Sequence, residues 1–343
     1  MIAPKNLLIV RSDRIGDVIL SLPLGEIVKR KYPDCKITFL IREYTSPLVK
    51  DNPSIDKVLI LKEKDHKFLI KENITALKKE NFDTSIIVYP TLRLAITIFL
   101  SGIKSRIGTG YRWYSIFFNR KVFEHRKYAE RHELEYNVGL LKKIGIEENV
   151  SPGKVNFYLK VSDEEKKSIE DILKKNDVNP KNKLLIIHPG SGGSSVDLPT
   201  EKMIDLTKRL SEINNLQIII TGNKSEVELC KKFVFNNSIK NFAGKFNLSQ
   251  LKTLISFADL FISNSTGPIH IAAALNKQVF GFYPKILSCS AERWGPYTEK
   301  RTIFTPTIDC SNCSREQCEK LDCMNSIDIG KVFDECITVL KNC

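Results

Sequence analysis

Short apolar runs separated by amphipathic stretches recur along the whole chain. Apolar runs of strand length, bounded by polar turns, predict buried strands. They cover residues 7–10, 36–41, 57–61, 84–89, 106–108, 155–159, 184–187, 217–221, 260–262 and 279–282. Between them, apolar positions recur at helical spacing and predict helices. These cover residues 15–22, 67–79, 92–100, 131–144, 162–177, 200–213, 225–235, 249–257, 268–275 and 326–340. Strands that alternate with helices are typical of βαβ units and of parallel sheets.

The pattern runs through the chain twice. The strand at 106–108 is predicted to close the first half, and a polar linker follows at 147–154. The second half opens with the capping-box signature of Ser162 and Glu165, and a strand with a glycine-rich loop follows it. We therefore predict an α/β protein of two Rossmann-like domains, residues 1–160 and 161–343. Ligands bind at the carboxyl ends of such strands, so we expect the site in a cleft between the domains.

Composition narrows the class of partner. The 343 residues carry a net charge of +13, with 42% hydrophobic and 27% charged residues. This is the composition of a globular protein, and the charge favours an anionic partner. A nucleic acid, an acidic membrane surface, a phosphorylated substrate and a merely solvated basic surface all remain open at this point. The basic residues are spread along the chain without a recognised nucleic-acid motif, so we expect no nucleic acid.

Two apolar segments bear on location. The run Leu7–Val10 after Lys5 is too short for a secretory signal, and the segment Leu94–Leu100 is too short to span a bilayer. We therefore expect a cytoplasmic protein that can sit on the cytoplasmic face of the inner membrane.

A strand, a small polar turn and a helix follow one another at residues 259–275. The turn Ser263–Gly267 precedes Pro268, which suits the first position of a helix. The free N–H groups of Ser265, Thr266 and Gly267 then attract phosphate, and His270 can add a donor. The alternative is an ordinary connection between a strand and a helix.

Two further turns follow predicted strands. The turn Gly190–Gly193, with Ser191 inside it, offers bare N–H groups, although it is neither a Walker A motif nor a dinucleotide fingerprint. The turn Arg11–Gly16 leads to Asp17 at the start of a helix. A carboxylate there can be catalytic or can simply cap the helix.

These segments together resemble glycosyltransferase family 9, the ADP-heptose:lipopolysaccharide heptosyltransferases of GT-B fold. The similar blocks are Arg11–Asp17 with Leu20 and Pro23, His188–Gly193, Ser263–Ala274 and the spaced cysteines 310, 313, 318 and 323. They stand in the family's order and extend over nearly the whole chain.

The resemblance implies an inverting, metal-independent transfer of a sugar, with ADP-heptose as donor and a lipopolysaccharide core as acceptor. It implies that Asp17 is the base that takes the proton of the acceptor hydroxyl. The donor is expected to contact Ser191, Gly192, Gly193, Glu226, Ser265, Thr266, Gly267 and His270. Arg11 and Arg14 are expected to bind acidic groups of the acceptor. No cofactor is expected beyond the nucleotide sugar as co-substrate.

The chain departs from the family at two positions. The basic residue usual before the second-domain proline is replaced in the segment Val196–Pro199, and the acid usual before Ser265 is Asn264. The candidates to compensate in part for the missing basic residue are Ser194, Ser195 and Lys224. The alternatives are a different nucleotide-sugar donor, or a catalytically weak protein that binds a nucleotide sugar or a glycan.

The cysteines at the end of the chain raise the question of a metal. Cys310, Cys313, Cys318 and Cys323 offer four thiolates, but only the first gap is usual for zinc and no histidine lies between them. We expect no metal there, and reduced thiols or a disulfide clip are the alternatives.

Overall fold

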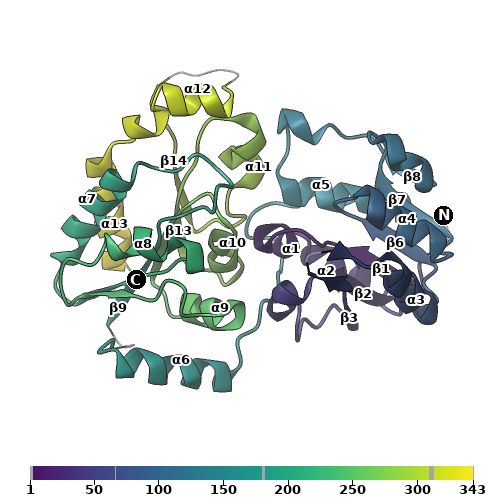
Figure 1. Cartoon of the computed structure of the whole chain (residues 1–343), viewed down its shortest axis with the longest axis horizontal. Helices are drawn as coiled ribbons and strands as arrows, with labels where there is room; N and C mark the ends of the chain where they lie inside the picture. Colours follow the sequence, from purple (N-terminus) through teal and green to yellow (C-terminus); the bar gives the residue numbers. More distant parts are fainter. Residues whose placement is uncertain (1–2, 66, 180–181, 309–312, 343) are drawn as a thin grey trace. The chain divides into compact units, whose positions relative to one another are not determined.

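The computed structural model describes residues 3–65, 67–179, 182–308 and 313–342. The chain divides into two compact units (Figure 1). Within the described residues, unit 1 extends to Arg126 and includes Glu133–Lys160, and unit 2 comprises Lys127–His132 and the chain from Val161 onward. The segment Lys127–His132 thus packs with unit 2, although the sequence prediction placed it in the first domain.

Unit 1 contains a parallel sheet of six strands with the order β3-β2-β1-β6-β7-β8. The strands are β1 (Asn6–Val10), β2 (Lys36–Ile41), β3 (Lys57–Ile60), β6 (Thr84–Ile87), β7 (Ser105–Thr109) and β8 (Arg120–Val122). The helices are α1 (Ile15–Ile19), α2 (Pro23–Lys31), α3 (Ile70–Glu80), α4 (Leu92–Leu100) and α5 (Glu133–Gly139), and a small hairpin joins β4 (Glu63–Lys64) to β5 (Lys67–Phe68). Short 3₁₀ helices are η1 (Glu43–Leu48), η2 (Trp113–Phe117), η3 (Arg126–Tyr128) and η4 (Leu140–Ile144).

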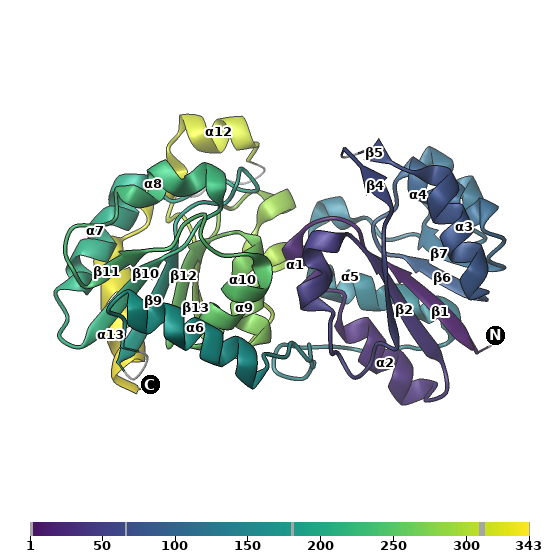
Figure 2. The same ribbon diagram turned by 60° about the horizontal axis from the view of Figure 1, so that its bottom comes forward.

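Unit 2 repeats the same topology with the order β11-β10-β9-β12-β13-β14 (Figure 2). Its strands are β9 (Lys183–His188), β10 (Leu216–Ile220), β11 (Ile239–Asn241), β12 (Leu260–Asn264), β13 (Gln278–Phe282) and β14 (Arg301–Phe304). Its α-helices are α6 (Asp163–Lys175), α7 (Thr200–Ser211), α8 (Val227–Lys231), α9 (Leu248–Ser256), α10 (Gly267–Ala274), α11 (Ala291–Trp294), α12 (Arg315–Lys320) and α13 (Ile329–Asn342). Its 3₁₀ helices are η5 (Lys224–Glu226), η6 (Leu287–Cys289) and η7 (Cys323–Ser326).

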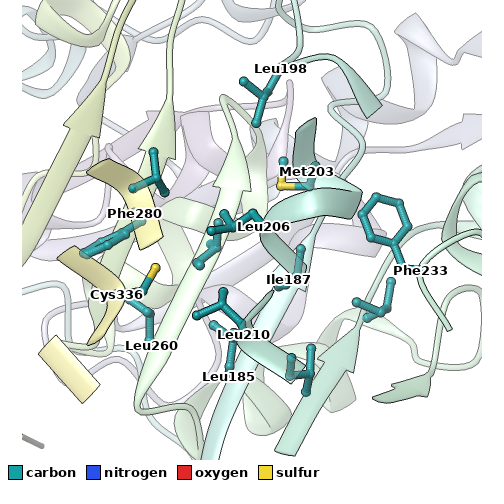
Figure 3. Packing of buried hydrophobic residues seen from close by; sticks show 14 of the residues in the cluster. Leu185, Ile187, Leu198, Met203, Leu206, Leu210, Phe233, Leu260, Phe280 and Cys336 are labelled. Carbon is teal, nitrogen blue, oxygen red and sulfur yellow. The ribbon is translucent and has the colours of Figure 1, made fainter. Parts of the chain in front are cut away.

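The two sheets confirm the predicted α/β class with two Rossmann-like domains. Strands of such sheets are covered on both faces, which explains their continuous apolar runs. In unit 2, Leu185 and Ile187 of β9 belong to the same buried cluster as Leu206 and Leu210 of α7 (Figure 3). Cys336 of α13 is buried in the same cluster.

Several local predictions were wrong. The helix expected at 67–79 begins at Ile70, because Lys67 and Phe68 pair with Glu63 and Lys64 in the hairpin. The segment 155–159 forms no strand, and the carbonyl of Phe157 instead accepts a hydrogen bond of 3.0 Å from the Asn52 side chain.

Beyond the hairpin, three strands of the two large sheets were missed. β8 follows the strand that was expected to be the last of its half, and β11 and β14 are also edge strands of the second sheet. Their sequences mix polar and apolar residues, as edge strands commonly do, so no apolar run marks them.

The predicted helix at 131–144 is divided into α5 and the 3₁₀ helix η4. The capping box at Ser162 is present as expected, with Glu165 N–H donating to the Ser162 hydroxyl. No helix in the described part of the chain combines the length and the apolar character required to cross a bilayer.

Candidate functional site

In each sheet, the chain segments that follow two neighbouring central strands run to opposite faces of the sheet. In unit 1, β1 lies between β2 and β6, and its last residue Val10 is in register with Leu40 and Ile87. The chain leaves β1 and β6 toward opposite sides, so the loops after them separate and leave room for a ligand. In unit 2, β9 and β12 have the same place. The loops that follow β1, β9 and β12 are the three turns that the sequence singled out.

Arg11, directly after β1, is the centre of the unit 1 site. Its side chain is 1% exposed, and its Nε lies 2.7 Å from Asp13 Oδ1. The guanidinium also pairs with Asp17 and, at 3.5 Å from Nη1, with Glu133. Burial works against the charge, but the three carboxylates outweigh it, so the pKa of Arg11 rises above its ordinary value. The residue predicted to bind the acceptor therefore already holds three acids of its own unit.

Asp13 and Asp17 share this guanidinium. Burial, together with the negative charge of Asp17, raises the pKa of Asp13 to about 7, although Arg11 opposes the shift. Asp17 lies in the first turn of α1, yet this helix has no side-chain cap at its start. Its carboxylate bonds to Arg11 instead, and its side chain remains 15% exposed. The arrangement can therefore accept a proton at a carboxylate whose position is fixed by a buried cation.

Two residues of α5 complete the cluster and were missed from the sequence. Glu133, 2% exposed, pairs with Arg11 and Arg126. Asn137 donates from Nδ2 to the carbonyl of Leu20 at 3.0 Å and accepts from Arg126 at 3.2 Å. One helical turn separates Glu133 from Asn137, so they share a helix face. Their position among apolar neighbours was the signal available, since polar residues on a buried face need partners.

Arg14 lies apart from this cluster. It is exposed to solvent at the start of α1, whereas Arg11 is buried. Of the two arginines predicted to bind the acceptor, Arg14 is the one with a side chain open to a ligand.

In unit 2, the loop after β9 is shaped by glycine. Gly192 and Gly193 have φ of +57° and +77°, a region that side chains rarely adopt. A Cβ atom on Gly190 lies 2.1 Å from the position of Glu226 Oε1, so the loop approaches that carboxylate as closely as it does because it has no side chain there. Beside Gly193 nothing lies within 4 Å of such an atom. The loop therefore has one packed side and one open side.

Glu226 holds the packed side of this loop. Its carboxylate accepts from Gly192 N at 3.1 Å and from Asn223 N at 2.8 Å. The nearby His188 has its pKa lowered to about 4 by burial, so it is neutral at physiological pH. Glu226, which was predicted to contact the donor, is thus bonded to the backbone of its own unit through both oxygens. Among the described residues, the Gly193 N–H donates no hydrogen bond, so it remains available to an anion.

Polar side chains tie the loop after β9 to the turn after β12. Asn264 accepts from Leu198 N at 2.9 Å and donates to the carbonyl of Pro189 at 2.6 Å. The Ser194 hydroxyl lies 2.9 Å from the carbonyl oxygen of Ser265. The amide at position 264, which departs from the family pattern, therefore has a structural use, because it can both accept and donate.

The turn after β12 leads into α10 as the sequence predicted. Thr266 is the extended N-cap residue, its side chain makes no capping hydrogen bond, and Pro268 lies in the first turn. The N-terminus of α10 is consequently open to an anion. His270 is buried, 5% exposed, in the same helix. Of the predicted donor-binding residues, five thus lie in one connected group: Ser191, Gly192, Gly193, Glu226 and Ser265. The other three follow directly along the chain: Thr266, Gly267 and His270.

A residue from the end of the chain joins this group. Arg315 of α12 donates to the carbonyl oxygens of Gly193 at 3.0 Å and Ser195 at 3.2 Å. Val196, which replaces the family's basic residue, packs against a buried cluster that contains Cys313, Cys318 and Cys323. Arg315 therefore places a cation at this loop from far along the chain, where no local sequence signal marks it.

The cysteine tail shows no metal site in the part of the chain that the structure describes. Cys313, Cys318 and Cys323 are buried together with Ile286, and Cys289 packs against them. No group of three or more His, Cys, Asp or Glu side chains there could hold a metal ion, if only the described residues are counted. Cys310, the first of the four predicted thiols, lies outside the described residues.

Comparison with known proteins identifies related chains. Residues 71–323 match the model of glycosyltransferase family 9 (heptosyltransferase). The chain is 26% identical to lipopolysaccharide heptosyltransferase 1 of Campylobacter coli, over 80% of this chain and 84% of that one. It is 27% identical to the lipopolysaccharide core heptosyltransferase OpsX of Haemophilus influenzae, over 82% and 79%. The solved structure of Escherichia coli ADP-heptose lipopolysaccharide heptosyltransferase II superposes with a TM-score of 0.79, 19% identity and coverage of 98% and 99%.

The raised pKa of Asp13 predicts a pH-dependent gain in stability for Asp13→Asn. The folded-state pKa of about 7 exceeds the ordinary value of 3.8, so the stability that protonation contributes is present below pH 4 and is lost as the pH rises through 7. Asparagine resembles the protonated form at every pH. The variant also loses one ion pair of the buried Arg11, so the prediction concerns the change with pH. We expect the free energy of unfolding of the variant, relative to that of the wild type, to rise by about 1–3 kcal/mol between pH 5 and pH 8.

Hydrogen exchange, followed in peptides of unit 1 at both pH values, measures this difference. The exposed Asp51 provides the control, because Asp51→Asn removes the same charge outside the cluster. A difference for Asp13→Asn that does not change with pH contradicts the assignment.

Proposed function

The chain belongs to glycosyltransferase family 9, and on that premise we propose that it transfers heptose from ADP-heptose to a lipopolysaccharide core, with inversion and without a metal. Its activity as a glycosyltransferase follows from the family. The finer proposal draws on the names of its heptosyltransferase relatives and on the chemistry of the two loop sites. The observation that carries it is Asp17, a partly exposed carboxylate fixed by a buried arginine at the ligand-binding end of a parallel sheet.

In the proposed reaction, Asp17 accepts the proton of an acceptor hydroxyl. The acceptor oxygen attacks the anomeric carbon of the sugar, and the bond from that carbon to the diphosphate oxygen breaks. One displacement of this kind inverts the configuration. Arg11 has a positioning role, because it is buried against Asp17 and holds the carboxylate in one orientation. Asp13 is the next candidate for the base, since its pKa of about 7 suits proton transfer near neutral pH.

In the same reaction, the departing ADP gains negative charge on its terminal phosphate. The open N–H of Gly193 and the N-terminus of α10 at Thr266 and Gly267 offer donors for that charge. Arg315 adds a cation beside them. These groups belong to unit 2, so the proposal assigns the donor nucleotide to unit 2 and the acceptor to unit 1.

Two alternatives keep the same sites. A different nucleotide sugar requires the same phosphate groups, since nothing in these contacts selects the sugar. A catalytically weak binding protein is favoured by the apolar residue at 196. The presence of Arg315 beside the loop argues for a functional phosphate site in either case.

Asp17→Asn tests the proposed base. The substitution keeps the size of the side chain and removes its ability to accept a proton. We expect the rate of sugar transfer to fall by about 10²–10⁴-fold, the usual contribution of general base catalysis. Affinity for ADP should stay within about twofold of the wild type, because the proposed phosphate groups belong to unit 2.

Transfer rate and ADP affinity are measured on the same preparation, together with Asp13→Asn. Turnover near the wild-type rate for Asp17→Asn, with a large loss for Asp13→Asn, transfers the role of base to Asp13. Loss of ADP binding in Asp17→Asn contradicts the assignment of the two substrates to the two units.

Arg315→Ala tests the cation beside the glycine loop. We expect ADP to bind about three- to tenfold more weakly, as for a partly exposed charge-assisted contact, while adenosine binds as before. Isothermal titration with both ligands measures the difference. Glu319→Gln is the matched control, because it frees Arg315 from its ion pair of 2.9 Å without removing the guanidinium. An equal loss for ADP and adenosine shows that Arg315 supports the fold of the loop and does not act on phosphate.

A further inference from the structure

We propose that unit 1 attaches to a bilayer surface of anionic lipids through Phe99, Leu100, Trp113 and Ile116, here called the η2 patch. The inference goes beyond the proposed function, because it depends on exposure and charge and not on sugar transfer. It also specifies how the enzyme meets a lipid-linked acceptor, if that function holds. The patch is formed by the end of α4 and by η2, which pack against each other, and η2 also contacts β7. Figure 1 shows α4 next to β7 and β8.

Exposed apolar side chains are concentrated in this part of the chain. Trp113 and Ile116 are 74% and 72% exposed, and Leu100 and Phe99 are 48% and 44% exposed. Among the described residues, seven of the fifteen large hydrophobic side chains that are exposed fall between Thr84 and Phe123. They are Tyr89, Phe99, Leu100, Tyr111, Trp113, Ile116 and Phe123. A concentration of exposed apolar side chains of this kind marks an interaction site.

The fold does not require the outward side chains of η2. In a 3₁₀ helix, residues three apart lie on the same side. Tyr114 and Phe117 form the inward side, since both pack against the core of unit 1 and Tyr114 donates to the carbonyl of Pro90 at 2.8 Å. Trp113 and Ile116 are three apart as well and form the outward side, where they contribute little burial. Their apolar character therefore needs an explanation outside the folding of unit 1.

The ring contacts connect the two parts of the patch. The Phe117 ring lies 5.3 Å from the Phe99 ring, measured between centroids, which places the end of α4 next to η2. The guanidinium of Arg106 lies 5.1 Å from the centre of the same Phe99 ring. An arginine thus borders the apolar surface directly.

The charge around the patch selects the partner. No aspartate or glutamate occurs between Thr84 and Phe123, whereas six lysines and arginines do: Arg93, Lys104, Arg106, Arg112, Arg120 and Lys121. Exposed aromatic and aliphatic groups on a segment whose only charged side chains are cationic match the boundary between anionic headgroups and acyl chains. A second copy of the chain fits this surface less well, because a symmetric contact brings the same cations together.

Tryptophan fluorescence tests the patch directly. The chain has two tryptophans, so Trp294→Phe leaves Trp113 as the single reporter. With vesicles of phosphatidylcholine that contain phosphatidylglycerol, we expect the emission of Trp113 to shift to shorter wavelength and to be quenched by brominated lipid. Vesicles of phosphatidylcholine alone should produce neither change, and added salt should weaken the effect. An emission that anionic vesicles leave unchanged overturns the proposal.

Vesicle cosedimentation of variants of the full chain identifies the surface. We expect Trp113→Ser with Ile116→Ser, and separately Arg93→Glu with Arg112→Glu, to weaken binding at least tenfold. The matched control is Val234→Ser with Phe235→Ser, two adjacent residues of unit 2 that are 45% and 42% exposed. An equal loss in the control, or no loss in the η2 variants, overturns the assignment.

Two further measurements distinguish lipid binding from a loss of folding and from self-association. Hydrogen exchange in peptides of unit 1 should be unchanged in the η2 variants, which shows that unit 1 remains folded. Sedimentation velocity that reveals a dimer abolished by Trp113→Ser with Ile116→Ser overturns the lipid proposal in favour of self-association. Vesicle binding does not depend on the sugar donor, so an absence of heptose transfer leaves this test intact.

Discussion

The buried guanidinium of Arg11 is the constraint on which the unit 1 site depends. A buried charge is costly unless it is paired and hydrogen-bonded, and Arg11 meets this requirement with Asp13, Asp17 and Glu133. The pairing joins the loop after β1 to α5, two segments far apart in the chain. Burial of the same cluster, with the negative charge of Asp17, raises the pKa of Asp13 to about 7, although Arg11 opposes the shift. Stability and proton chemistry at this point have the same physical origin.

The repeated topology places loops of different composition at equivalent positions in the two units. In both sheets the first strand lies at the point where the connections part, so the loop after it faces a ligand. In unit 1 this loop carries charged side chains, led by Arg11. In unit 2 it carries Gly190, Gly192 and Gly193, which expose backbone and leave room. The first arrangement suits proton transfer, and the second suits an anion.

Local patterns in the sequence predicted the strands and loops well, because each depends on neighbours in the chain. The loop at Arg11 and the turn before Pro268 follow apolar runs that mark their strands. The partners of those loops could not be predicted in this way. Glu133 meets Arg11 across more than a hundred positions, and Arg315 meets Gly193 across a similar distance. Such contacts arise when elements pack, and a single sequence contains no periodicity that reports them.

The unit 2 site also shows why an apolar residue at position 196 does not leave the loop without charge. Asn264, Glu226 and Ser194 fix the backbone of the loop before any ligand arrives, which lowers the entropy lost on binding. The same fixed backbone presents the carbonyl oxygens of Gly193 and Ser195, and their partial negative charges oppose an anion. The guanidinium of Arg315 binds both oxygens, so it neutralises this repulsion and adds a positive charge beside the open N–H of Gly193. In the proposed phosphate site, the positive charge at this loop therefore comes from the chain's last helices and not from the loop itself.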